Sequence, residues 1–167
     1  MIRALLAAFA IAASGCVAAA PTEVAQRPHN PQLPGPKLLA PAAEVAREYA
    51  CAARGKPLLV LEQSSIRPTP LAAGEEFAHR IVYALCPARG QQGAAGKLRT
   101  RIRFGSTVVV DDTAAYRVEP GRWAVDTFIA LPPKAAPGAY EIDLEFTSAQ
   151  LGFATRVPFS VWVPATR

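Results

Sequence analysis

Few side chains in this 167-residue sequence could catalyse a reaction. There are two histidines, and His29 lies in a proline-rich stretch, so a Ser-His-Asp triad would have to use His79. His79 shares strand parity with apolar neighbours, which favours a partly buried, hydrogen-bonded histidine over a catalytic one. The candidate nucleophiles lack the flanking glycines of a nucleophile elbow; they are Ser64, Ser65 and Ser160. We therefore predict that the protein is not an enzyme.

The sequence also offers few residues that could bind a metal ion or a phosphate group. A zinc site would need more histidines and cysteines than the sequence supplies. Asp111 and Asp112 could contribute to a calcium site, but no further acidic residues are spaced for it, so we interpret them as a hairpin tip. The glycine-rich stretch 90–96 precedes a predicted strand and lacks the lysine and serine of a phosphate loop. We expect no metal, no cofactor and no small-molecule substrate.

The first 15 residues have the proportions of a secretory signal peptide. One positive charge at Arg3 precedes an apolar run that is too short to remain as a membrane-spanning helix. The run ends in Ala13-Ser14-Gly15-Cys16, which resembles the bacterial lipobox, although Ala13 stands where that family most often has leucine. The resemblance implies that Cys16 carries lipid and becomes the N-terminus, and that Val17 after it directs the protein to the outer membrane, facing the periplasm. Ordinary cleavage at Ala18-Ala19-Ala20, with free secretion, is the alternative.

The three cysteines are consistent with export. If Cys16 is lipidated, Cys51 and Cys86 remain, and an exported protein seldom leaves thiols free. We therefore predict a Cys51–Cys86 disulfide; the alternative is two separately buried thiols.

Composition divides the chain into four segments. After the signal peptide, residues 16–41 contain six prolines and almost no aromatic or β-branched side chains, which predicts an extended tether. Residues 42–57 contain good helix formers up to Arg54, followed by Gly55 and Pro57, and predict one short helix packed on the domain. Residues 58–167 predict a domain of strands and turns.

The strands of that domain alternate cleanly. Between Tyr140 and Phe146, apolar residues at even positions alternate with acidic residues at odd positions, as expected of an antiparallel strand with one face in water. Roughly seven to eight such strands with Pro/Gly turns predict an all-β, immunoglobulin-like antiparallel sandwich. The chain resembles the immunoglobulin and fibronectin III superfamily from about Leu58 to Val163, including the turn at Pro137-Gly138-Ala139-Tyr140. Cys51 precedes the first strand, unlike the cysteines of antibody domains, and no function follows from the fold.

Two strands carry opposite charges on their outward faces. If the strand order is immunoglobulin-like, 97–104 and 139–146 are neighbours, and we predict a structural charge ladder between them. An anion-binding or nucleic-acid patch is the alternative, but without Arg3 the chain has only 17 basic against 13 acidic side chains, so we expect no nucleic-acid partner. The ladder consists of Arg99, Arg101 and Arg103 opposite Glu141, Asp143 and Glu145.

The remaining candidate surface surrounds Trp162, whose parity opposes the apolar face of the last strand; Arg156 lies on the same outward face. We predict a non-catalytic, lipid-anchored cell-envelope protein that binds an envelope protein as an assembly or accessory subunit. The alternative is a carbohydrate-binding module for envelope or surface glycan. A long unpaired edge strand with exposed apolar residues would favour protein binding, and a flat pair of exposed aromatics would favour glycan.

Overall fold

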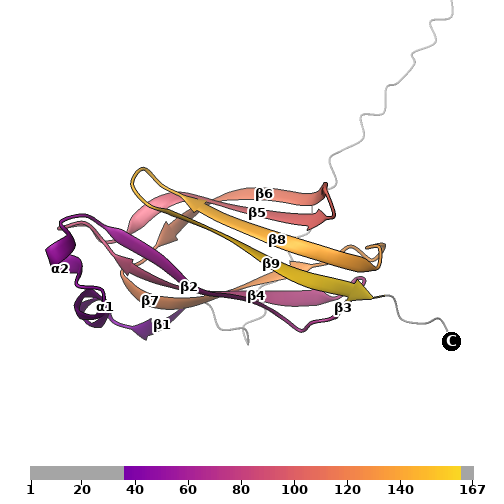
Figure 1. The fold of residues 1–167 in the computed structure, drawn as a ribbon, viewed down its shortest axis with the longest axis horizontal. Helices are drawn as coiled ribbons and strands as arrows, with labels where there is room; N and C mark the ends of the chain where they lie inside the picture. Colours follow the sequence, from indigo (N-terminus) through magenta and orange to yellow (C-terminus); the bar gives the residue numbers. More distant parts are fainter. Residues whose placement is uncertain (1–35, 163–167) are drawn as a thin grey trace, which may run out of the picture. The chain divides into compact units, whose positions relative to one another are not determined.

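A computed structural model describes residues 36–162, which form two mainly antiparallel sheets in a sandwich with short helices at its N-terminal end (Figure 1). The four-stranded sheet has the order β1-β7-β4-β2, and the five-stranded sheet has the order β3-β9-β8-β5-β6. The strands are β1 (Lys37–Ala40), β2 (Leu58–Arg67), β3 (Leu71–Ala72), β4 (Glu76–Cys86), β5 (Ala94–Phe104), β6 (Thr107–Val118), β7 (Gly121–Ala130), β8 (Gly138–Thr147) and β9 (Gly152–Trp162).

The strand order confirms the predicted immunoglobulin-like sandwich. β2, β4 and β7 are ordered like strands A, B and E of that fold, and β9, β8 and β5 like strands G, F and C. There are nine strands instead of seven to eight, because two short segments also pair. β3 runs parallel to the end of β9, and β1 occupies the place beside β7 where the fold otherwise has strand D. Lys37–Ala40, assigned to the tether by composition, therefore belongs to a sheet.

The core forms where the apolar faces of the alternating strands meet. Tyr140, Ile142, Leu144 and Phe146 of β8 are all buried, as predicted. Two buried clusters fill the space between the sheets, one around Phe77 and Phe159 and the other around Tyr83 and Phe146. Pro158 lies in β9 where β3 provides no partner, so its missing N–H costs no ladder hydrogen bond on that side.

The single helix predicted for 42–54 is wrong: the segment forms α1 (Ala42–Glu48) and α2 (Cys51–Arg54). Ala50 between them adopts the left-handed conformation, with φ 50° and ψ 43°. Tertiary contacts on both sides override the helix propensity. Val45 packs against Ala40, Ala84 and Cys86 on the outer face of the four-stranded sheet, and Cys51 is bonded to Cys86, confirming the predicted disulfide.

The left-handed Ala50 gives a first testable prediction. Ala50→Gly should raise the free energy of unfolding by about 0.5–1 kcal/mol, because glycine avoids the Cβ penalty of this conformation, which outweighs the entropy that it adds to the unfolded chain. Ala53→Gly, within α2, is the matched control and should lower stability by about 0.5–1 kcal/mol. Urea unfolding measures both, and a loss of stability in both variants would contradict the prediction.

Candidate functional site

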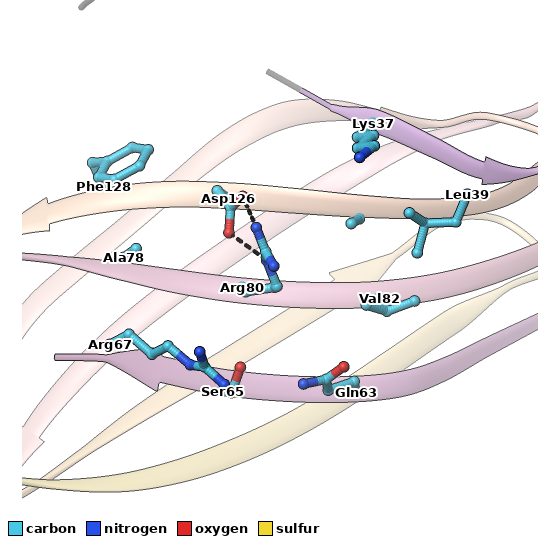
Figure 2. A pocket seen from close by; sticks show the side chains of 11 residues that line it. Lys37, Leu39, Gln63, Ser65, Arg67, Ala78, Arg80, Val82, Asp126 and Phe128 are labelled. Atoms are coloured by element: carbon cyan, nitrogen blue, oxygen red, sulfur yellow. Dashed lines mark hydrogen bonds and ion pairs between the residues drawn. The ribbon is translucent and has the colours of Figure 1, made fainter. Parts of the chain in front are cut away.

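The outer face of the four-stranded sheet contains a hollow of about 550 Å³ (Figure 2). Its floor is built from small side chains of the two central strands, Ala78 and Val82 of β4 and Ala124 of β7. Lys37 and Leu39 of β1 line one side, and β2 lines the other (Figure 2). The β2 residues are Gln63, Ser65 and Arg67.

Strand register places these side chains in rows across the sheet. Outward side chains recur every second residue along each strand, so residues in register on neighbouring strands share a row. Lys37 stands only in the first row, because β1 begins there. The rows are Gln63, Val82, Ala124 and Lys37; then Ser65, Arg80 and Asp126; then Arg67, Ala78 and Phe128.

A bidentate ion pair crosses the middle row. Arg80 donates from Nε to Oδ1 of Asp126 at 2.8 Å and from Nη2 to Oδ2 at 2.7 Å (Figure 2). The Arg80 hydrogen bonds lower the pKa of Asp126, which keeps the pair ionised and locally neutral. Among the described residues, Lys37 and Arg67 form no ion pair, so the hollow carries a positive surplus.

The edge of β7 beside this hollow is open along half of its length. β1 pairs only with the segment from Arg122 to Ala124. From Val125 to Ala130, β7 has no strand on that side in the described part of the chain, and Thr127, Phe128 and Ala130 are exposed.

A second edge without a pairing strand in residues 36–162 runs along the whole of β6. This strand has 12 residues and, among the described strands, pairs only with β5. Val108 and Val109 are exposed by 41% and 46%, and the register shifts between Ile102 and Arg103, where Val109 is the extra residue. Asp111 and Asp112 lie within β6, so their predicted placement at a hairpin tip is wrong; the turn lies at Gly105-Ser106. Pairing with β5 continues past them, with Asp111 opposite Arg101 and Asp112 opposite Thr100.

The predicted ladder residues face one another in register: Arg99 with Glu145, Arg101 with Asp143 and Arg103 with Glu141. The contacts, however, are mostly diagonal. Asp143, exposed by 6%, accepts from Arg103 Nε at 2.8 Å and from Arg156 Nε at 2.6 Å. Burial would raise the pKa of Asp143, but the hydrogen bonds from Arg156 and Arg103 outweigh it and lower that pKa.

Arg156 and Asp111 belong to this charge cluster although neither was predicted as a member. Arg156 of β9 was assigned to a candidate binding surface, whereas its guanidinium pairs with Asp143 and lies 3.6 Å from Glu141. Arg99 binds Asp111 of β6 through two hydrogen bonds of 2.8 and 2.6 Å. No local sequence pattern reveals which strands flank the central pair of β5 and β8, so these partners could not be predicted.

The buried carboxylate of Asp143 supports a second prediction. Asp143→Ala should lower the free energy of unfolding by about 2–3 kcal/mol, because Arg101, Arg103 and Arg156 then lose their shared counter-charge. Glu145→Ala is the matched control, since the partly exposed Glu145 meets only Arg101 at 3.6 Å among the described residues, and should cost less than about 0.5 kcal/mol. Chemical denaturation measures the stability of both variants. Equal losses of stability would contradict the prediction, because Asp143 would then contribute no more than Glu145.

The other predicted site residues fall in different places. Trp162 is 46% exposed at the end of β9, on the outer face of the five-stranded sheet. Phe128 lies on the outer face of the other sheet, so these two exposed aromatics do not form one platform. Cys16 lies outside the described residues.

His79 is inside the sandwich and 2% exposed. Its Nε2 lies 2.8 Å from Oγ of Ser64 on the neighbouring strand, within hydrogen-bond distance. Burial lowers the pKa of His79 to about 4. The described residues show no carboxylate hydrogen-bonded to this ring, and residues 36–162 contain no group of three side chains placed to bind a metal ion.

Comparisons with known proteins identify no family. No family model matches the chain, and no curated protein matches it. A β-glucosidase from Erythrobacter marinus shows weak structural similarity, with a TM-score of 0.43, 10% identity, and coverage of 64% of this chain but 16% of that enzyme. A β-glucuronidase from Parabacteroides merdae has a TM-score of 0.39 at 15% identity and covers 62% of this chain and 13% of the enzyme. The chain thus spans under a fifth of the length of either enzyme.

Proposed function

We propose that this protein is a non-catalytic cell-envelope lipoprotein that binds an envelope protein as an assembly or accessory subunit. The observation that carries the proposal is the free edge of β6, which offers unpaired backbone N–H and C=O groups beside the exposed Val108 and Val109. An extended segment of a partner can pair with such an edge, gaining affinity from main-chain hydrogen bonds and specificity from alternate side chains.

The composition of β6 leaves most of this edge available for pairing. Protected edges usually carry lysines, prolines, β-bulges or inward-pointing charges that discourage pairing. β6 has no lysine or proline, its one bulge lies at Val109, and one of its two carboxylates, Asp111, is already neutralised by Arg99. The unpaired carboxylate of Asp112 and the bulge at Val109 would then select the register of the partner.

Anchoring through Cys16, with the proline-rich segment as a tether and the outer membrane as the location, belongs to the same proposal and is supported by the lipobox-like sequence. No helix within residues 36–162 is long and apolar enough to cross a membrane. Glycan binding remains the alternative function, but Phe128 and Trp162 on opposite faces do not supply the paired platform that it requires.

Site-specific crosslinking in the native cells tests the proposal. A photo-crosslinking amino acid at Val109 should capture a defined envelope protein, identified by mass spectrometry. The same probe at the exposed Glu76 of β4 is the matched control and should not capture it. Cys16→Ser should abolish membrane association and reduce the crosslink severalfold. Identical products from both positions would overturn binding at β6, and recovery of glycan alone would favour the alternative.

A further inference from the structure

The half of β7 that β1 leaves unpaired does not fully cover its inward-facing side chains. Thr127 lies on the inward-facing side of β7, directly opposite the buried His79 of β4, yet Thr127 itself is exposed. Ile129, two residues further on, is only partly buried and packs against the same cluster as Val110 of β6. Within residues 36–162, β1 therefore fills the place of strand D only beside residues 122–124, and no strand lies beside β7 residues 125–130.

The chain's own preceding residues are poorly suited to this place. Continuing β1 backwards in its register would set Pro36 opposite Val125 and Pro34 opposite Thr127. Proline has a fixed φ near −65° and no N–H, and Gly35 between the two adds little strand propensity. The strand accordingly begins at Lys37, directly after Pro36.

The residues around this edge of β7 determine which side chains a strand bound there could carry. Side chains opposite Val125, Thr127 and Ile129 would point between the sheets and must be apolar. Side chains opposite Asp126 and Phe128 would point to the hollow, whose Arg80–Asp126 pair is already neutral. A strand running in the direction of β1 would end against Lys37, which has no ion-pair partner among the described residues and would favour a carboxylate there.

We propose that the edge of β7 at residues 125–130, which no described strand pairs, is the seat of an extended segment from a partner protein, with alternating apolar side chains and a carboxylate at its C-terminal end. The inference deepens the proposed function and rests on it only in assuming that the occupant belongs to a protein. The added segment would extend strand D beyond β1 and cover the inward side chains of Thr127 and Ile129.

Variants of the full chain test whether this edge of β7 can pair with a further strand. Pro34→Val, Gly35→Thr and Pro36→Val together give the chain a segment that can pair with β7 in the register of β1. We expect amide hydrogen exchange between Val125 and Thr127, opposite the three substituted residues, to slow at least about tenfold at the positions facing the seat. The matched control carries Pro34→Asp, Gly35→Thr and Pro36→Asp, which removes the same prolines but turns carboxylates toward the core, and should give no protection. Unchanged exchange in the valine variant, or amides already protected in the wild-type chain, would overturn the inference.

Occupation by a separate chain is tested with a synthetic peptide. Acetyl-Ser-Thr-Val-Thr-Val-Thr-Val with a free carboxylate, added to the wild-type protein at about 1 mM, should slow the same amides at least about threefold. The same peptide N-methylated at alternate residues should not, because it cannot donate the ladder hydrogen bonds. Protection in the valine variant without protection by the peptide would show that the seat accepts only a linked segment. If the β7 tests fail while the Val109 crosslink persists, this inference falls and the proposed function stands.

Discussion

Removal of the Cys51–Cys86 disulfide is expected to lower the free energy of unfolding by about 3–4 kcal/mol. The two cysteines are 35 residues apart, and the bridge restricts that loop in the unfolded chain. In the folded chain it fastens α2 to the end of β4, where Cys86 packs with Val45 and Ala84. Such a loss is a large share of the 5–15 kcal/mol that stabilises a typical domain.

The measurement is urea unfolding of Cys51→Ser with Cys86→Ala, which places the hydroxyl at the partly exposed position and leaves the buried one apolar. Cys16→Ser serves as the background of both proteins, so that lipid does not complicate the comparison. Treatment of the parent protein with a reducing agent should produce a similar loss. A decrease below about 1 kcal/mol would mean that the 35-residue loop is already constrained in the unfolded chain.

Acidification from pH 6.5 to pH 4 is expected to remove about 3 kcal/mol of stability through His79 alone. Burial holds the pKa of this ring at about 4 in the folded protein, against 6.5 for an ordinary histidine. Between these two values the unfolded chain binds a proton that the native protein does not, so stability rises with pH. The contribution is complete above pH 6.5 and is lost as pH falls toward 4.

Two variants isolate this effect. His79→Gln keeps a polar group that can reach Ser64 but does not titrate, and its stability should be nearly independent of pH between 4.5 and 6.5. Ser64→Ala removes the hydrogen-bond partner and should retain the slope, because burial causes the shift. Carboxylates with lowered pKa values, such as Asp126 and Asp143, lose their contribution mainly below this window. A slope that survives in His79→Gln would assign the pH dependence to other groups.

The buried and outward faces of strictly alternating segments were predictable, because successive side chains of a strand point to opposite faces whatever its partners. The buried face of β8 and the opposition of Arg101 to Asp143 followed from this local rule and an assumed strand order. Which carboxylate each arginine binds did not follow, since Arg99 reaches across to Asp111 and Arg156 arrives from β9. Diagonal contacts depend on twist and rotamers, which the sequence pattern does not contain.

The sequence by itself determined the class of fold, the buried faces of the main strands, the burial of His79 and the pairing of Cys51 with Cys86. Each rests on side-chain chemistry or on a short-range periodicity. Only the tertiary structure decided that the helix breaks at Ala50, that β1 covers just the first part of β7, and that a hollow and an open flank result. These features arise where segments that are distant in the sequence meet. They therefore depend on how the segments are arranged in space, which no single segment encodes.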